Sequence, residues 1–336
     1  MKRTELKAHT VILLSLLLAC IFCNSVWAGP GAVFEGGKGP GKGKHIVFVV
    51  GDEEYRGEES MPQMAKILSV HHGFKCTVLW ALNKETGEID PMTLDNIPGL
   101  EALEKADLMV MFLRFRELPD KQMKYIMDYT NSGKPIVAFR TSTHPFNYKN
   151  SQSPYAKWSF RSKDPKGGYG REVLGETWIS HYGRHQVEST RGLIADGMED
   201  HPIVKGIDDI WGESDVYGLT TLHGDCKPII MGQVLKGMNP DDEPNPDKKL
   251  VPVAWTKTYT GTQGKTSRIF TTTMGHSFDF NSEGFRRLAV NACYWAMAME
   301  DKIPAKSKVD LVGQYNPSKI GFGKCKKGVK PSDHEL

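Results

Sequence analysis

Histidines and carboxylates gather in two short stretches of the sequence, where their types suit acid–base chemistry. His181 and His185 are four residues apart, and Glu213 and Asp215 alternate in the stretch WGESDVYG. On an extended chain, alternating carboxylates face the same way, which suits proton transfer or ion binding and equally suits a solvated edge. His276 follows a later apolar run. We therefore take Glu213 or Asp215 as the candidate catalytic base, with one of the three histidines as its partner.

A metal site is the alternative for the same residues. His181 and His185 would share one face of a helix, but Gly183 between them argues against a helix there. A divalent metal held by the two histidines and the nearby acids stays open. No other cofactor follows from the sequence, because no glycine-rich phosphate-binding motif follows the first apolar run.

A second set of polar residues consists mainly of residues that stand directly after apolar runs. In open parallel sheets, ligands bind beyond the carboxyl ends of the strands, so we expect these residues to contact a small polar or anionic ligand. Arginines would hold its oxygens by forked hydrogen bonds. Structural alternatives are a helix cap for Asp52 and ion pairs for the arginines. The candidate ligand-binding residues are Asp52, Glu53, Tyr55, Arg114, Arg140, His144 and Tyr217.

Strands that alternate with helices must position these residues. Continuous apolar runs predict strands buried on both faces, at 46–50, 76–80, 108–112 and 135–139. Helical spacing occurs at 58–72, 100–105 and 119–129, between those runs. This rhythm predicts βαβ units and a right-handed parallel sheet. Shorter strands are expected at 229–235, 251–255 and 268–273, and the clearest helix at 282–299.

The amino terminus has the pattern of a cleavable signal peptide. Basic residues precede an apolar run at 11–23, and small residues stand before an expected cut ahead of Gly29. The run is shorter than the roughly 20 residues of a membrane-spanning helix. Lipoprotein processing at Cys20 is a less favoured alternative. We expect export to the periplasm or the medium, with no transmembrane segment after cleavage.

Composition divides the chain into four regions and limits its partners. We expect the signal peptide at 1–28, a Gly/Pro-rich linker at 29–44, an α/β domain at 45–303 and an irregular C-terminal tail at 304–336. The formal net charge is +3, of which the predicted signal peptide supplies two charges. The remainder gives no reason to expect a nucleic-acid partner.

Four cysteines lie outside the predicted signal peptide. They are far apart and without CxxC spacing, which excludes a zinc ribbon. Cys76 and Cys293 stand in apolar contexts, so we expect buried thiols there. Neither a disulfide pairing nor the oligomeric state follows from the sequence.

The end of the fourth predicted strand bears on nucleophilic catalysis. A strand followed by a sharp turn is where class I glutamine amidotransferases carry a catalytic cysteine and hydrolases a serine. Here Arg140 follows the strand, and Ser142 lacks flanking glycines. Catalysis by a triad of the amidotransferase type is therefore not supported.

Several motifs, taken in order, resemble the ThuA-like (trehalose utilisation) family over roughly His45 to Met299. They are the first strand with its acidic end, PIVAFRTSTHPF, HPIVKGI, WGESDVYG, PVAWTKTYTGTQGKTSRIFTTTMGHS and FRRLAVNACYWAM. The resemblance implies a class I glutamine amidotransferase-like fold, which is a flavodoxin-like three-layer α/β sandwich with a mainly parallel central sheet. It also implies a link to carbohydrate metabolism, without an agreed mechanism. The family commonly places a histidine where Arg140 stands.

Three functional hypotheses follow. The first is an exported enzyme that acts on a carbohydrate or carbohydrate derivative, with isomerase- or hydrolase-like proton transfer. The second is a non-catalytic carbohydrate-binding or scaffold protein in which Trp178, Trp211 and Tyr217 stack on sugar faces. The third is a metal-dependent site. Convergence of the acids and histidines in one cavity would favour an enzyme, and aromatics along a shallow groove would favour binding.

Overall fold

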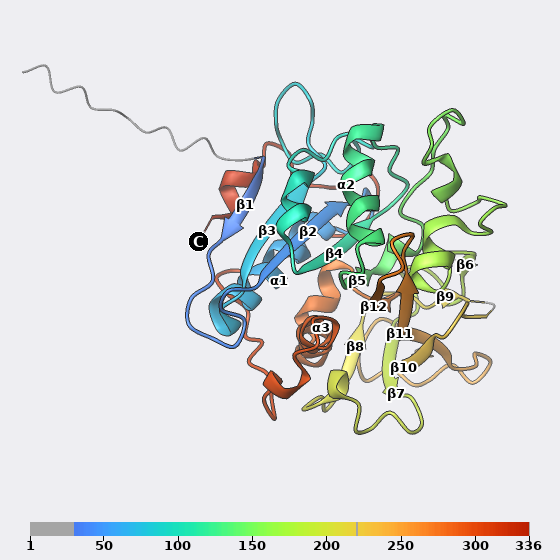
Figure 1. Cartoon of the computed structure of the whole chain (residues 1–336). Helices are drawn as coiled ribbons and strands as arrows, with labels where there is room; N and C mark the ends of the chain where they lie inside the picture. The colour runs from blue at the N-terminus through green and yellow to red at the C-terminus, as the bar shows by residue number, and fades with distance from the viewer. Residues whose placement is uncertain (1–29, 220, 336) are drawn as a thin grey trace, which may run out of the picture.

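Five parallel strands form the centre of one large sheet (Figure 1). The computed structural model describes residues 30–219 and 221–335, so the predicted signal peptide lies outside the described residues. The parallel strands are β2 (His45–Gly51), β3 (Lys75–Trp80), β4 (Leu108–Leu113), β5 (Ile136–Phe139) and β12 (Thr266–Thr272). Their spatial order, β3-β2-β4-β5-β12, is the 2-1-3-4-5 order of flavodoxin-like folds. The predicted fold class is confirmed.

Antiparallel strands extend the sheet beyond β12. They are β11 (Val251–Thr260), β10 (Lys227–Val234), β7 (Thr190–Ile194) and β8 (Ile210–Gly212), in that spatial order. A separate two-stranded sheet joins β6 (Ser180–His181) to β9 (Tyr217–Gly218). The sequence predicted β10, β11 and β12, and it missed β6, β7, β8 and β9.

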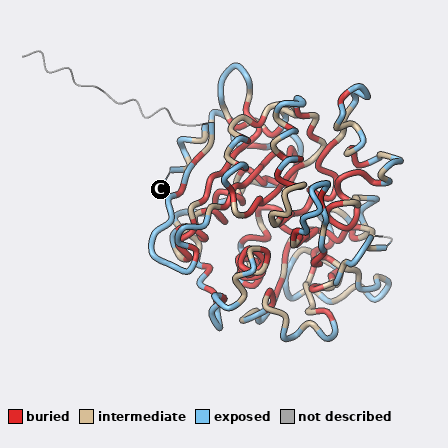
Figure 2. Tube along the Cα trace, viewed as in Figure 1, coloured by how far each residue is buried: buried red, intermediate tan, exposed pale blue. Residues whose placement is uncertain are grey.

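Helices cover both faces of the parallel strands. Helices α1 (Gly57–His72) and α3 (Glu283–Ala296) pack on one face, with Phe48 and Val50 of β2. Helix α2 (Asp120–Asn131) and the 3-10 helix η1 (Leu100–Lys105) pack on the other, with Val47 and Val49. Because successive strand residues face opposite layers, both sets must be apolar, which explains the continuous apolar runs. Figure 2 shows buried residues along these strands and exposed ones in the loops.

Short helical turns make up the remaining helical structure, at Arg140–Thr143, Ala156–Trp158, Gly170–Leu174, Pro202–Val204, Ser277–Asn281, Glu300–Lys302 and Pro331–His334. None of the described helices has both the length and the apolar character needed to cross a membrane. Cys76 and Cys293 are buried free thiols, as predicted.

The segment predicted as a linker, 29–44, contains a strand of the sheet within its described residues. Strand β1 (Gly31–Phe34) pairs antiparallel with β3 along the sheet edge. Ala32 and Phe34 are buried in the core beside α1. The strand was not predicted because the segment is rich in glycine and proline. It has only four residues, and only two of them, Ala32 and Phe34, are buried. The domain therefore begins before His45.

Candidate active site

The Asp215 carboxylate lies at the centre of the candidate site and bonds two histidines. The Nδ1 of His181 donates to Oδ2 at 2.5 Å, and the Nδ1 of His185 donates to Oδ1 at 3.0 Å. The Asp215 side chain is only 1% exposed. The structure thus brings together three of the predicted catalytic residues on a single carboxylate.

The small β6–β9 sheet makes this meeting possible. His181 in β6 pairs with Tyr217 in β9, two residues beyond Asp215. The backbone N–H groups of Tyr182 and Gly183 donate to Val216 O at 2.8 and 3.1 Å. A Cβ on Gly183 would stand 3.2 Å from Val216 N, so glycine permits the close approach. The four-residue spacing of the histidines therefore spans a strand and a turn, as Gly183 suggested, rather than a helix.

Arg140 fixes the Asp215 carboxylate from the opposite side. Its guanidinium donates to Asp215 Oδ1 at 2.6 Å and to the carbonyls of Asp215 and Thr273 at 2.7 Å each. It also lies over the rings of Tyr217 and Tyr55, at 4.1 and 4.5 Å from their centroids. Burial opposes ionisation of Asp215, but Arg140 and the two histidine hydrogen bonds outweigh burial and hold its pKa well below the ordinary value.

His185 lies between two carboxylates. Its Nδ1 faces Asp215, and its Nε2 lies 3.4 Å from Oε1 of Glu54, which follows β2. These two acceptors raise the pKa of His185 to about 9, against the opposing effect of partial burial. His185 is therefore an imidazolium at neutral pH, with Nδ1 hydrogen-bonded to Asp215 and Nε2 within ion-pair distance of Glu54.

His181 differs from His185 because only one of its nitrogens is engaged. Its Nδ1 bonds Asp215, while Nε2 has no hydrogen-bond partner among the described residues. Its side chain is 34% exposed. A carboxylate that orients a histidine and leaves its outer nitrogen free is the arrangement used for general acid–base catalysis.

A cavity of about 280 Å³ adjoins this cluster. His185, Asp215, Glu213 and His276 contribute to its wall. Glu213 makes no hydrogen bond or ion pair within the described residues, and burial followed by the nearby Asp279 raises its pKa. Burial lowers the pKa of His276, whose Nδ1 accepts from the N–H of Phe278 at 3.0 Å. The opposite wall comes from the C-terminal tail, including Lys319 and Lys324.

The same cluster contains a donor set for a metal ion. His181, His185 and Asp215 each offer one ligand atom, and these atoms lie within 4.8 Å of one another. Two imidazoles and a carboxylate are ligands that zinc and other first-row divalent ions accept. The Arg140 guanidinium on Asp215 opposes a cation there, because it already neutralises the carboxylate.

Three predicted ligand-binding residues, Asp52, Glu53 and Arg114, have structural partners instead. Asp52 is fully buried and accepts from the N–H groups of Glu54 and Tyr55 and from the Thr141 hydroxyl. Asp52 therefore organises the turn between β2 and α1. It does not cap α1, whose N-cap residue is Arg56 and has no side-chain cap bond. The Glu53 carboxylate forms ion pairs with Arg114 at 2.5 Å and with Arg116 at 2.6 Å. The pair with Arg114 is the structural ion pair that the sequence offered as an alternative to ligand binding.

Arg140 and His144 are also closed off from a ligand. Every hydrogen bond of the Arg140 guanidinium goes to a carbonyl or to the Asp215 carboxylate, so this side chain positions the carboxylate rather than holding a ligand. His144 is 2% exposed and surrounded by Trp178, Tyr217 and Phe115. Burial, followed by Arg114 and Arg140, lowers its pKa well below the ordinary value. Tyr55 and Tyr217 are likewise buried, as supports for Arg140.

Two positioning residues were missed. Glu54 stands next to predicted Glu53, but strand alternation does not tell which of the two faces His185. Asp279 accepts from the N–H groups of Ser214 at 3.0 Å and Gly275 at 2.7 Å, which ties the Asp215 loop to the end of β12. Its position in the stretch HSFDFN gave no signal beyond a polar residue before a helix.

Comparison with known proteins identifies relatives by sequence model and by structure. Residues 46–296 match the ThuA family model, described as trehalose utilisation. A ThuA-like protein from Parabacteroides merdae is 14% identical with a TM-score of 0.49, covering 88% of this chain and 100% of that one. One from Bacteroides uniformis is 14% identical with a TM-score of 0.47, covering 77% and 93%. PurLQS from Thermotoga maritima is 10% identical with a TM-score of 0.38, covering 75% and 99%. No curated protein sequence matches significantly.

Proposed function

Because the chain belongs to the ThuA (trehalose utilisation) family, we propose that it is an enzyme acting on a carbohydrate or carbohydrate derivative. The reaction is an isomerase- or hydrolase-like proton transfer at the pair formed by His181 and Asp215, here called the dyad. One observation carries the proposal: Asp215 holds Nδ1 of His181 at 2.5 Å and leaves Nε2 unpaired within the described chain.

The dyad suits proton transfer because each partner has one task. Arg140 keeps the buried Asp215 ionised, and Asp215 in turn fixes the orientation and tautomer of His181. Nε2 of His181 is then free to take a proton from a hydroxyl, from water, or from carbon next to a carbonyl. Glu213 supplies a second acid–base group at the cavity wall. Arg140 takes the first position of the turn after β5, and the buried Ser142 hydroxyl in that turn donates to the carbonyl of Met111, so a covalent acyl mechanism is not supported.

Turnover by single variants tests the dyad. The protein is incubated in D₂O with disaccharides, keto-sugars and sugar lactones, and hydrolysis, isomerisation or C–H exchange is followed by proton NMR. We expect His181→Gln to lower the rate by roughly 10²- to 10⁴-fold, the usual range for a general acid–base group. His71→Gln is the matched control, because His71 is partly exposed on α1 and contacts Asp310 instead. Binding without any turnover would support the non-catalytic alternative and contradict the enzyme.

A metal-dependent reaction at the same residues is the second candidate, favoured by the donor set of His181, His185 and Asp215. A divalent ion there would polarise a substrate oxygen. Metal analysis of the purified protein and the visible spectrum after Co²⁺ addition distinguish the two. One bound equivalent that both His181→Gln and His185→Gln abolish supports the metal. Full activity after chelation, with no stoichiometric ion, supports the metal-free dyad.

We also propose that the protein is exported, on the strength of the pattern at residues 1–28. Its substrates would then be glycans or their breakdown products outside the cytoplasm. N-terminal sequencing of protein from the periplasm or medium should begin at Gly29. A chain that begins at Cys20 would show lipoprotein processing, and an uncut chain in the cytoplasm would contradict export.

A further inference from the structure

A groove beside the dyad is lined by basic and aromatic side chains. It has a volume of about 580 Å³, within the range of sites that hold small organic ligands. The loop before the helical turn Gly170–Leu174 and the segment after it form its walls. We call it the basic groove, and its charged and aromatic lining consists of Phe160, Arg161, Lys163, Lys166, Arg171 and Trp178, with Glu176 as the one acid.

The positive charge of the basic groove is not neutralised from within. Glu176 accepts from Arg171 at 3.0 Å and from the N–H of Thr177 at 2.8 Å. Glu176 therefore neutralises Arg171 and not the other basic residues of the groove. Arg161, Lys163 and Lys166 have no carboxylate partner in residues 30–219 and 221–335, and all three are exposed. Asp164 shares their loop without lining the groove. The whole chain has nearly equal numbers of basic and acidic residues, 43 against 40, so this concentration is local.

The basic groove reaches the dyad through Trp178. The Trp178 ring lines the groove and meets the ring of His181 edge-on, at 5.9 Å between centroids. On its other side His181 lies 4.9 Å from His185, which lines the 280 Å³ cavity. Lys319 and Lys324 of that cavity also lack an acidic partner among the described residues. Cations without an acidic partner among the described residues therefore line both the basic groove and the 280 Å³ cavity, the two hollows that Trp178 and His185 connect to His181.

We propose that the substrate is an anionic carbohydrate, whose carboxylate or sulfate groups bind the basic groove while a sugar ring packs on Trp178. Lysine and arginine donate strong charge-assisted hydrogen bonds to such groups, and an aromatic ring covers the apolar face of a sugar. A nucleic acid fits less well, because the basic residues line two small hollows on a chain with a formal net charge of only +3. The inference rests on the proposed function for the reacting centre and adds the class of substrate.

Calorimetric binding of matched oligosaccharides tests the proposal. Acidic probes are trimers of galacturonate, of mannuronate and of a sulfated galactose, and the neutral probes are galactose and mannose trimers. We expect at least one acidic probe to bind, with affinity that falls as NaCl rises. The double variant Lys163→Gln/Lys166→Gln should weaken it at least about tenfold. Preference among the acidic probes tells carboxylate from sulfate recognition.

The control is Lys38→Gln/Lys42→Gln, which removes the same charge from exposed lysines near the β1 edge. It should bind like the unaltered chain, and thermal melting checks that both variants are folded. Neutral trimers that bind as tightly as acidic ones, no binding by any acidic probe, or equal loss in the control would each overturn the proposal. His181→Gln should bind normally, so a failed dyad shows in turnover and a wrong substrate class shows in binding.

Discussion

Arg140 combines an unfavourable backbone conformation with strong contacts from the two terminal nitrogens of its guanidinium, while its buried Nε has no hydrogen-bond partner. Its φ of 44° lies in the left-handed region, which costs a non-glycine residue roughly 1–3 kcal/mol. The guanidinium makes three hydrogen bonds of 2.6–2.7 Å, and two of them go to Asp215. The turn after β5 therefore aims this side chain at a carboxylate 75 residues further along the chain.

Removing the guanidinium should destabilise the protein more than removing both charges. Arg140→Met removes the buried guanidinium and leaves the Asp215 carboxylate with only its two histidine partners, so it should lower the free energy of unfolding by roughly 3–5 kcal/mol. Adding Asp215→Asn removes that charge and should restore part of the loss. Urea denaturation of the two single variants and the double variant measures the coupling. Additive effects of the two substitutions would show that the pair is not coupled.

At the scale of single residues, the sequence predicted the members of the histidine–carboxylate cluster better than the residues that support it. His181, His185 and Asp215 were predicted from residue type and spacing, and the structure joins them on one carboxylate. Arg140 and Asp52 were expected to bind a ligand because they follow strands. Their partners, Asp215 and Thr141, lie 75 and 89 residues away, and such long-range pairings cannot be deduced from local pattern.

Helix α1 contains a proline whose missing N–H is compensated from the sheet. Pro62 lies within the helix and cannot donate to the carbonyl of Glu58. The indole Nε1 of Trp80, at the end of β3, donates to that carbonyl at 3.2 Å. Both groups are buried, so the indole satisfies an acceptor that water does not reach.

Trp80 and Pro62 should therefore be thermodynamically coupled. Trp80→Phe leaves the Glu58 carbonyl unsatisfied, and we expect a loss of about 1–3 kcal/mol in the free energy of unfolding beyond any packing change. In a Pro62→Ala background the helix supplies its own N–H, so the same substitution should cost less. Chemical denaturation of this four-protein cycle gives the coupling. Equal costs in the two backgrounds would contradict the role assigned to the indole.

At the scale of elements, the sequence predicted the fully buried strands and missed short or partly exposed ones. Strands β2, β3, β4 and β5 were predicted because both of their faces are apolar, and their ends differ from prediction by no more than one residue. Strands β7 and β8 were missed because they are short and half-exposed, and β1 because glycine and proline surround it. Amphipathic spacing found α3, although its end was placed three residues too late, at Met299 instead of Ala296.

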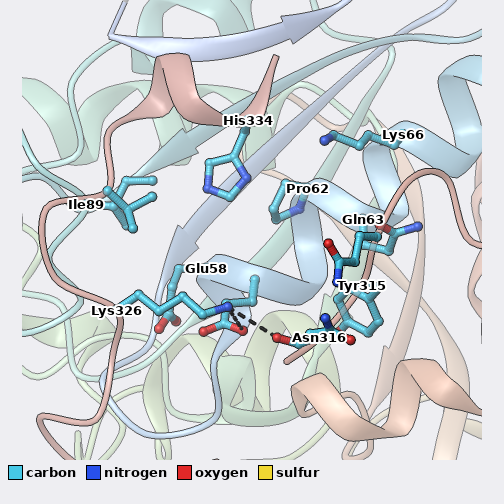
Figure 3. Close-up of a pocket in the computed structure, with 12 residues that line it drawn as sticks. Glu58, Pro62, Gln63, Lys66, Ile89, Tyr315, Asn316, Lys326 and His334 are labelled. Atoms are coloured by element: carbon cyan, nitrogen blue, oxygen red, sulfur yellow. Dashed lines mark hydrogen bonds and ion pairs between the residues drawn. The ribbon is translucent and has the colours of Figure 1, made fainter. Parts of the chain in front are cut away.

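The C-terminal tail connects distant parts of the whole molecule. Its described residues contain one short helical turn, Pro331–His334, and the tail packs closely on the domain. The N–H of Gly321 donates to Glu54 O at 2.8 Å, and that of Ser318 donates to Glu59 at 2.8 Å. Between the tail and α1 lies a pocket of about 140 Å³, distinct from the cavity at the dyad. Figure 3 shows Glu58 there, with Lys326 and His334 contributed by the tail.

Glu58 makes the stability of this arrangement depend on pH. Both carboxyl oxygens lack a hydrogen-bond partner. Burial raises the pKa of Glu58 to about 8 despite the nearby Arg56 guanidinium, from an ordinary value of 4.5. Between these two pH values the folded protein keeps a proton on Glu58 that the unfolded chain has released. The contribution of Glu58 to the free energy of unfolding is therefore complete below pH 4.5 and is lost as pH rises through about 8.

Unfolding measurements between about pH 6.5 and 8.5 should show the loss. We expect the free energy of unfolding to fall by about 2 kcal/mol over this range, beyond the change seen in Glu58→Gln. The range avoids His334, whose buried ring has its pKa lowered to about 4. Parallel pH profiles for the two proteins would mean that Glu58 ionises normally in the fold.

Strand β1 covers an edge of β3 that could otherwise pair with a strand of another molecule. Its four residues occupy the hydrogen-bonding edge of β3 from Cys76 to Leu79. A chain shortened to begin at His45, close to where the family match starts, would bare that edge and uncover the apolar contacts of Ala32 and Phe34. Exposed edges of this kind recruit strands from other molecules. Such a chain should self-associate in light scattering, because the segment that resembles a spacer also keeps the protein from aggregating.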